Sequence, residues 1–328
     1  MFRSLSALSA AVLLAFVSGR AEDNQFVRPR LGYVFDASTR QIRPLIGTPG
    51  AALVAGGVPL DLALDRALVS SANSFAIVTA PDSANVKVVR LLESGPIVTP
   101  IPNSFDTYDL GSLSRSGKAA ILYQAACRCV QVLSGLPDDP QIARNLTLPP
   151  DESVVQALAI ADDSSRFAIA RRTGDSGEIT IYAQETSSEY PVSADALSFS
   201  SDGNSLALVD TVRKAVSMLR DGNIIEIATD REGLNTPIAA SFASGDRIVI
   251  SDRESRIHVV STDRSRAVSI ACPCMPTAVE LTSIADTFRI SELASGALWI
   301  AQISDENTRA MFIPEDHTEA AQGAEDGK

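Results

Sequence analysis

Four cysteines are the residues in this sequence whose spacing points most directly to chemistry. They form two Cys-x-Cys pairs, Cys127-Arg128-Cys129 and Cys272-Pro273-Cys274. In an extended strand, residues i and i+2 are about 6.5–7 Å apart, which is at the limit for a disulfide. We therefore expect a local disulfide between Cys272 and Cys274, where the proline favours a loop, rather than in the strand expected at Cys127 and Cys129. Buried free thiols and a four-thiolate zinc site are the alternatives, in that order.

The two histidines lack the partners of any familiar catalytic or metal-binding motif. His258 alternates with Ile257 and Val259 in an expected strand and is predicted to face away from them, and His317 lies near the C-terminus. Two histidines cannot build a three-histidine metal site, and no G-x-S-x-G, H-E-x-x-H, P-loop or G-x-G-x-x-G motif occurs in the sequence. The sequence thus predicts no catalytic residue, no metal site and no resident cofactor, and leaves open only a bound divalent cation.

The elements that must position any site repeat with a period of about 43 residues. Each unit reads as an apolar strand, a short turn of Ser, Asp, Gly and Asn, a second apolar strand and two further alternating strands. The first apolar residues of the six second strands are Phe75, Ala119, Phe167, Leu206, Ile248 and Phe288. A repeat of about 40–45 residues with four strands per unit is typical of a β-propeller, an all-β fold in which four-stranded antiparallel blades surround a channel.

The length of the repeat region sets the number of blades. Residues 31–313 contain six complete units, and residues 32–47 (GYVFDASTRQIRPLIG) read as a further strand–turn–strand hairpin. We expect seven blades with an incomplete first one, and six blades with an accessory hairpin is the alternative. Residues 153–163 and 291–304 have an apolar spacing that suits a helix as well as a strand, and their place in the repeat favours strands.

A set of polar side chains stands four residues after each of the six repeat positions, at the end of the second strand. Equivalent positions in a ring cluster near one mouth of the central channel, where propellers usually bind ligands. The set comprises Thr79, Tyr123, Arg171, Asp210, Asp252 and Glu292. We predict that these side chains form an uneven polar circle able to hold a cation or a polar ligand. Ordinary solvation of strand ends is the alternative.

The Asp202-Gly203 turn between two apolar strands (LSFSSDGNSLALVD, 197–210) resembles the WD40-like and YVTN-type repeats of exported bacterial propellers. In those repeats a turn of the Ser-Pro-Asp-Gly kind joins the two inner strands, and here Ser201 stands in place of the proline. The resemblance covers about residues 31–313 and implies a β-propeller fold. It implies no particular activity, since propellers include hydrolases, lyases, dehydrogenases and pure binding modules.

The N-terminal residues read as a secretory signal peptide. Residues 1–21 combine Arg3, an apolar run of 13 residues at 5–17 and small residues at Gly19 and Ala21. Such a run is too short to cross a bilayer, which needs about 20 residues in a helix. We therefore expect cleavage after residue 21, a linker at 22–30, the propeller at 31–313, and a disordered acidic tail at 314–328. The product is expected in the periplasm or outside the cell, with no transmembrane segment.

Charge and motif content narrow the function to three hypotheses. With 28 Lys+Arg against 40 Asp+Glu and a net charge of −12, nucleic-acid binding driven by phosphate charge is disfavoured. The absence of a catalytic signature favours a non-enzymatic binding or scaffold module for a protein or glycan partner in the envelope or outside the cell. The alternative is a metal-assisted, lactonase-like hydrolase that uses Asp210, Asp252 and Glu292. A third hypothesis is a component of a larger envelope complex.

Overall fold

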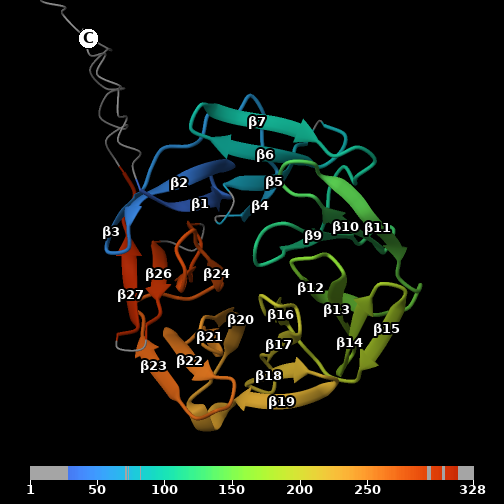
Figure 1. The fold of residues 1–328 in the computed structure, drawn as a ribbon, viewed down its shortest axis with the longest axis vertical. Coiled ribbons are helices and arrows are strands. Elements are labelled where there is room, and N and C mark those ends of the chain that lie inside the picture. The colour runs from blue at the N-terminus through green and yellow to red at the C-terminus, as the bar shows by residue number, and fades with distance from the viewer. Residues whose placement is uncertain are drawn as a thin grey trace, which may run out of the picture.

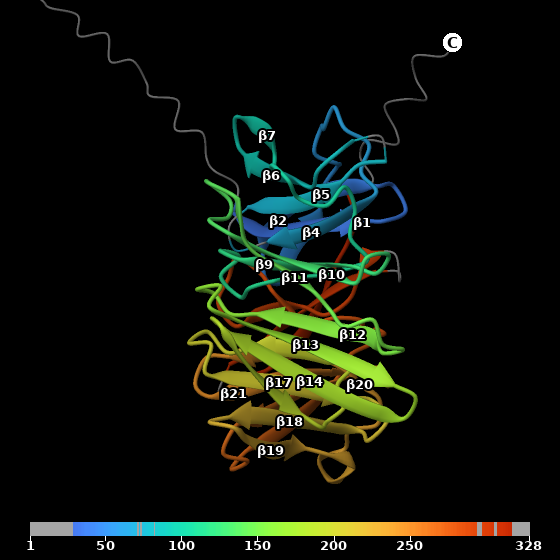
Figure 2. The same cartoon turned by 90° about the vertical axis from the view of Figure 1, so that its right-hand side faces the viewer.

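Seven small antiparallel sheets surround a central axis and together form a disc (Figures 1 and 2). The computed structural model describes residues 29–70, 72, 74–81, 83–293, 297–304 and 307–316. Blade one has three strands and the other six blades have four each. The predicted seven-bladed β-propeller with an incomplete first blade is therefore confirmed. Strands also occur within the two ambiguous segments, at Val154–Ile160 and at Leu298–Gln302. The described residues also include a short 3-10 turn at Asp230–Glu232.

The strands of each blade are consecutive in the chain and adjacent in the sheet. Blade one contains β1 (Arg30–Asp36), β2 (Gln41–Thr48) and β3 (Ala51–Val54). Blade two contains β4 (Arg66–Ser70), β5 (Phe75–Thr79), β6 (Lys87–Leu92) and β7 (Gly95–Pro100). Blade three contains β8 (Leu110–Leu113), β9 (Ala120–Gln124), β10 (Cys129–Ser134) and β11 (Gln141–Thr147). Blade four contains β12 (Val154–Ile160), β13 (Arg166–Thr173), β14 (Ser176–Ala183) and β15 (Thr186–Tyr190).

The remaining three blades follow the same plan, with the first strand nearest the axis and the fourth at the rim (Figure 1). Blade five contains β16 (Ala196–Phe199), β17 (Ser205–Asp210), β18 (Ala215–Arg220) and β19 (Asn223–Ala228). Blade six contains β20 (Pro237–Ala243), β21 (Arg247–Asp252), β22 (Arg256–Ser261) and β23 (Ala267–Ala271). Blade seven contains β24 (Glu280–Leu281), β25 (Thr287–Arg289), β26 (Leu298–Gln302) and β27 (Arg309–Ile313).

The second strands have a continuous apolar centre because neighbouring blades cover both of their faces. Every residue of β5 and of β17 is buried. The six repeat positions predicted from the sequence all lie at or beside the start of these strands, and each is at most 1% exposed. Burial on two faces replaces the usual in-and-out alternation of a surface sheet with a continuous apolar run.

The turns between the first and second strands need residues that tolerate a left-handed backbone. Gly203, between β16 and β17, has a φ of 66°. A Cβ atom there would lie 3.1 Å from the Cβ of Ala161 in the neighbouring blade four. Asp202 supports the same turn by accepting a hydrogen bond from the backbone N–H of Asn204 at 2.9 Å. The predicted turn thus fits both the local conformation and the packing between blades.

The ring closes between blade one and blade seven, which are two separate sheets. Apolar side chains from both blades pack in one cluster that includes Leu31, Val34, Leu45, Val54, Leu298, Ile300 and Ile313. Beyond β27 the chain also pairs with β3: Val54 donates its N–H to Pro314 O at 2.8 Å and accepts from Asp316 N–H at 2.9 Å. The acidic tail was predicted to be disordered from residue 314, and this start is wrong because 314–316 are held against β3.

Two predicted segments lie outside the described residues, namely the signal peptide at 1–21 and the tail from residue 317 onward, which includes His317. The described part of the linker is limited to residues 29 and 30. No helix long and apolar enough to span a membrane occurs in the part of the chain that the structure describes.

Candidate functional site

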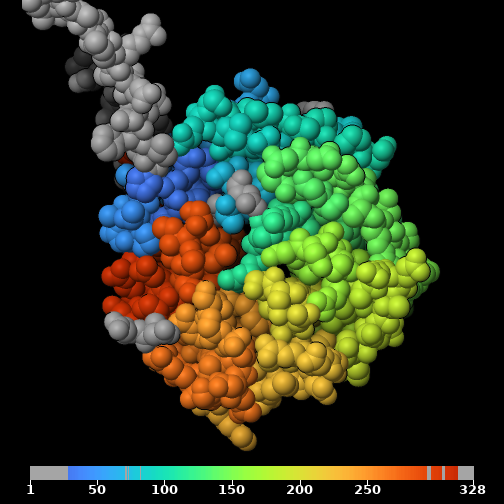
Figure 3. Space-filling view, viewed as in Figure 1, coloured from blue at the N-terminus to red at the C-terminus, as the bar shows by residue number. Residues whose placement is uncertain are grey.

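A cavity of about 500 Å³ occupies the central channel of the ring. Its wall consists mainly of the first strands of blades two to seven, and Figure 3 shows this face of the molecule hollowed near the axis, where the blades meet. Small side chains dominate the wall, including Ala67, Gly111, Ala159, Ala196, Ala239, Ala240 and Ala278. The volume falls within the range of about 300–1,000 Å³ that is usual for small-molecule sites.

One arginine reaches across this cavity. Arg115 lies in the turn between β8 and β9 of blade three and lines the channel. Its Nη1 atom donates a hydrogen bond to the backbone oxygen of Phe242 in β20 of blade six. Burial lowers the pKa of the Arg115 guanidinium, and the charges of Asp286 and Asp162 oppose that effect. Because an arginine pKa lies far above neutrality, this side chain is charged and links two opposite sides of the channel.

A second charged group projects from blade seven. The Nη2 atom of Arg289, in β25, forms an ion pair with Oε2 of Glu280 in the adjacent β24, and both residues line the cavity. The Arg289 side chain is 12% exposed, whereas the Glu280 side chain is 51% exposed. Arg289 also donates from Nη1 to the backbone oxygen of Ser291 at 3.0 Å. The buried arginine is thus held on two sides, while the carboxylate of Glu280 faces the open space.

Blade one contributes to the cavity in a different way because its strands match the second to fourth strands of the other blades. Asp36 ends β1, and its Oδ1 accepts from the N–H of Ser38 at 3.0 Å. Asp252, at the end of the second strand of blade six, accepts in the same way from the N–H of Glu254 at 3.0 Å. In the described part of the chain no strand of blade one takes the innermost position. Phe35 therefore lines the cavity directly.

The predicted polar circle does not form as a set. Thr79 is 2% exposed and Tyr123 is 5% exposed, and Tyr123 packs in the apolar cluster between blades three and four. Arg171 makes ion pairs with Asp151, at 3.3 Å, and with Glu178. None of these three residues lines the cavity. The side chains at the ends of the second strands are directed into blade interfaces and neighbouring turns because the first strands stand between them and the axis.

The two aspartates of the predicted circle are held by the backbone. Oδ1 of Asp210 accepts from Arg213 N–H at 2.9 Å. The fully buried carboxylate of Asp252 accepts from the N–H groups of residues 235, 236 and 254. The described residues contain no group of three or more His, Cys, Asp and Glu side chains placed to hold a metal ion. Asp210, Asp252 and Glu292 are therefore not brought together, and of the whole circle Glu292 alone lines the cavity.

The cavity is lined mainly by the first strand of each repeat, whereas the polar circle predicted from the sequence lies at the ends of the second strands. The residues that line the channel come from the first strand of each repeat, and that strand carries a recurring signal: alanine, glycine or serine at its centre, as at Ala67, Gly111, Ser198 and Ala240. Narrow side chains are needed there because six strands converge on one axis. Glu280 interrupts this pattern in the first strand of the last repeat, which is the signal that could have located it.

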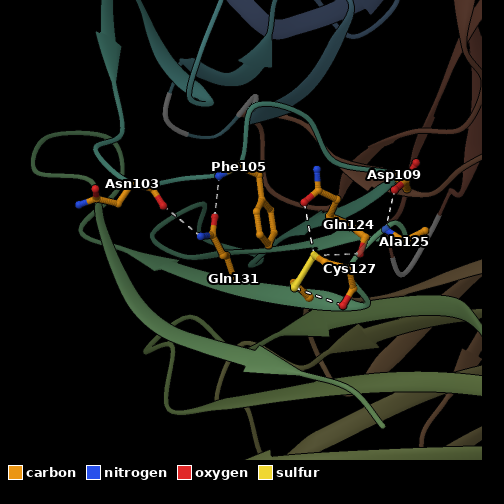
Figure 4. The surroundings of a disulfide bond; sticks show 8 residues. Asn103, Phe105, Asp109, Gln124, Ala125, Cys127 and Gln131 are labelled. Carbon is orange, nitrogen blue, oxygen red and sulfur yellow. Dashed lines mark hydrogen bonds between the residues drawn. A yellow bond between two sulfur atoms is a disulfide. The ribbon is translucent and has the colours of Figure 1, made fainter. Parts of the chain in front are cut away.

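Both cysteine pairs form disulfides in the structure, each with a Cα–Cα distance of 5.1 Å. Cys272 and Cys274 follow the end of β23, in a loop, as expected from Pro273. The expectation of a strand is wrong for Cys127, which lies in the turn between β9 and β10, where Arg128 has a φ of 53°, and is confirmed for Cys129, which begins β10. Figure 4 shows the Cys127–Cys129 disulfide at this turn. The turn brings the two Cα atoms closer than an extended strand would, and the bridge becomes feasible.

Comparison with known proteins extends the fold assignment. No protein-family model matches the sequence, and no curated protein matches it significantly. Among solved structures, a functionally unknown protein from Desulfotomaculum acetoxidans is similar with a TM-score of 0.59 and 14% identity, over 88% of this chain and 100% of that chain. A putative 6-phosphogluconolactonase from Bacteroides fragilis has a TM-score of 0.56 and 12% identity, over 87% and 92%. Virginiamycin B lyase from Staphylococcus aureus has a TM-score of 0.53 and 13% identity, over 75% and 82%.

These similarities confirm the propeller fold implied by the WD40-like and YVTN-type repeats. The similar structures include a lyase, a putative lactonase and a protein of unknown function. At 12–14% identity, a shared fold does not carry a shared activity. The similar structures therefore assign no activity to this chain.

Proposed function

We propose that this protein is a non-enzymatic binding module that holds a small cationic group in its central channel. The group is a primary amine or guanidinium presented by a protein or glycan partner, such as a lysine side chain or an amino sugar. The single observation that carries the proposal is the half-exposed carboxylate of Glu280, which faces the cavity beside the buried Arg289.

The balance of charge at this wall favours a cation. Two carboxylates, Glu280 and Glu292, and one guanidinium, Arg289, line the cavity where blade seven meets blade one. Arg289 is already bound to Glu280 and to a backbone oxygen. An incoming ammonium group would meet the exposed carboxylate of Glu280 within reach, although over the whole cavity the two carboxylates are matched by the guanidiniums of Arg289 and Arg115.

The walls restrict the size and shape of the ligand. The alanines and glycine of the first strands offer apolar surface for a hydrocarbon stem between the polar groups of neighbouring serines, while Arg115 reaches across the channel. A lysine stem has this character, with an apolar chain that ends in a charge. The channel therefore suits a single inserted side chain or one sugar unit better than a flat protein surface.

We further propose that binding takes place outside the cytoplasm, on the basis of the signal-peptide pattern at residues 1–21. Expression of the full chain in a Gram-negative host, followed by N-terminal sequencing of the periplasmic product, tests this part. The expected mature N-terminus is Glu22. A product that keeps Met1 and stays in the cytoplasm would contradict it.

Calorimetric titration with amine ligands tests the binding proposal. Suitable probes are a lysine-containing tripeptide and glucosamine, each compared with its N-acetylated form, which has the same shape without the charge. We expect binding of the amines only. Glu280→Gln should weaken it at least ten-fold, whereas the matched variant Glu226→Gln, at an exposed position on β19, should not. Equal binding of acetylated and free amines, or full affinity in Glu280→Gln, would refute the proposal.

A further inference from the structure

The two disulfides differ sharply in their exposure. Cys127 is exposed and Cys129 is partly exposed, at a turn on the surface of blade three. Cys272 is 2% exposed and packs in the apolar cluster between blades six and seven, with Cys274 beside it. Disulfide exchange requires that a thiolate reach one sulfur atom, so access separates a reactive bridge from an inert one. By this criterion the Cys127–Cys129 bond is open to attack at the exposed Cys127, whereas the Cys272–Cys274 bond, in which Cys272 is buried and Cys274 partly exposed, is less accessible.

The turn that carries the exposed bond is held in place by other interactions, among them the hydrogen bond from Ala125 N–H to Asp109 (Figure 4). Arg128, between the two cysteines, donates from Nε to Pro149 O at 2.8 Å and from Nη1 to Ser153 O at 2.7 Å, and its Nη2 forms an ion pair with Asp151 at 2.6 Å. The Arg128 carbonyl accepts from Leu148 N–H at 2.9 Å. Opening the disulfide would therefore leave the two sulfur atoms close together in a fixed turn, ready to close again.

A purely structural role explains this bridge poorly. Disulfides stabilise a fold mainly by closing long loops in the unfolded chain, and this one joins residues separated by two positions. The hydrogen bonds of Arg128 already fix the turn. The conformation of the turn therefore does not depend on a covalent bond.

We propose that Cys127 and Cys129 form a redox-active site that exchanges electrons with thiols and disulfides of small molecules or proteins. A thiolate attacks Sγ of Cys127, the bond between the cysteines breaks, and Cys129 leaves as a thiolate, so that a mixed disulfide forms at Cys127. A second thiolate then attacks the sulfur of the bound substrate and releases Cys127. Two substrate thiols are thereby oxidised to one disulfide, and the pair is reduced to two thiols.

Trapping experiments on the folded wild-type protein test the proposal without any substitution. The protein is incubated with reduced glutathione, quenched with N-ethylmaleimide at intervals, and mapped by peptide mass spectrometry. We expect Cys127 and Cys129 to be labelled at least ten-fold faster than Cys272 and Cys274. Equal rates, the reverse order, or labelling of Cys127 and Cys129 only under unfolding conditions would overturn the proposal.

A matched pair of variants tests whether the exposed Cys127 reacts faster than the buried Cys272. In Cys129→Ser the exposed Cys127 is left as a free thiol, and in Cys274→Ser the buried Cys272 is. With oxidised glutathione, we expect the mixed disulfide to form at least ten-fold faster in Cys129→Ser. A comparable rate in both variants, measured at equal thermal stability, would contradict the assignment of Cys127 as the sulfur that forms the mixed disulfide with the substrate. If either variant fails to fold, the wild-type labelling order still decides.

Discussion

The guanidinium of Arg115 is hydrogen-bonded to the backbone oxygen of Phe242, three blades further round the ring. Most other stabilising contacts in this propeller join neighbouring strands or neighbouring blades. This one crosses the channel, and it joins a turn of blade three to the first strand of blade six. The hydrogen bond between Arg115 and Phe242, called the strut below, can therefore form only when the whole ring is assembled.

Removal of this strut should weaken the entire ring. Arg115→Met keeps most of the side-chain length and removes the charge and the donors. We expect the free energy of unfolding to fall by about 1–3 kcal/mol, because a charged hydrogen bond is lost and a carbonyl is left unpaired. The control Arg213→Met removes a side chain that is 75% exposed and should change it by less than about 0.5 kcal/mol. Equal urea midpoints for the two variants would show that the strut contributes nothing.

Residues 314–316 are held against blade one by a backbone pairing and one ion pair. Val54 bonds to Pro314 and Asp316, and Arg43 bonds to Glu315 at 2.7 Å. Deletion of residues 317–328 should leave the melting temperature unchanged. Deletion of 314–328 should lower the free energy of unfolding by about 1–2 kcal/mol, since two backbone hydrogen bonds and a partly exposed ion pair are lost. Identical melting curves for both truncations would place the closure of the ring elsewhere.

The fold was predictable because the repeat is a property of burial. Each blade is covered on both faces, so its second strand must be apolar, and Phe75, Phe167 and Phe288 mark that requirement at regular intervals. The incomplete first blade could also be predicted, since Asp36 occupies the place of Asp210 after an apolar strand. Packing imposes the same apolar pattern on every blade, and one sequence contains enough repeat units for that pattern to be recognised.

The site was not predictable to the same degree because it breaks the repeat. Glu280 and Arg289 occur in one blade only, and their proximity depends on pairing between β24 and β25. Five of the six residues of the predicted circle do not line the cavity, for a related reason. The carboxylate of Asp252, for example, accepts hydrogen bonds from backbone N–H groups of nearby loops, and a sequence does not distinguish that use from ligand binding. Likewise, the spacing of Cys127 and Cys129 was misread because a turn, rather than a strand, sets their separation.

The repeat positions should carry a large share of the stability. Phe167 is 1% exposed and stacks on Tyr182 with ring centroids 4.8 Å apart. Phe167→Ala should lower the free energy of unfolding by about 3–5 kcal/mol, as expected when a cavity replaces a buried aromatic ring. Phe312, which is 49% exposed on β27, provides a matched control, and its replacement by alanine should cost about 1 kcal/mol or less. Chemical denaturation measures both, and similar losses would deny the repeat positions a special role.

Buried His258 should make the stability of the fold depend on pH. The side chain is 2% exposed, and its Nε2 atom has no hydrogen-bond partner among the described residues; the nearest carboxylate oxygen, on Asp252, is 3.9 Å away. Burial lowers the pKa of His258, Asp252 acts in the opposite direction, and Arg256 adds to the lowering. The prediction that His258 faces away from Ile257 and Val259 did not anticipate this burial, which arises because neighbouring blades cover both faces of β22.

The sign of the effect follows from proton binding. Below the unfolded pKa of about 6.5, the unfolded chain takes up a proton on this histidine and the folded protein does not, so acid favours unfolding. The free energy of unfolding should therefore fall as the pH decreases from 7 to 5, by up to about 1.4 kcal/mol per pH unit, until the lowered pKa is reached. His258→Gln should flatten this slope, whatever its effect on the stability at pH 7. An imidazole NMR titration of His317→Asn, which retains only His258, measures the pKa directly. A midpoint at or above 6.5 would contradict the assignment.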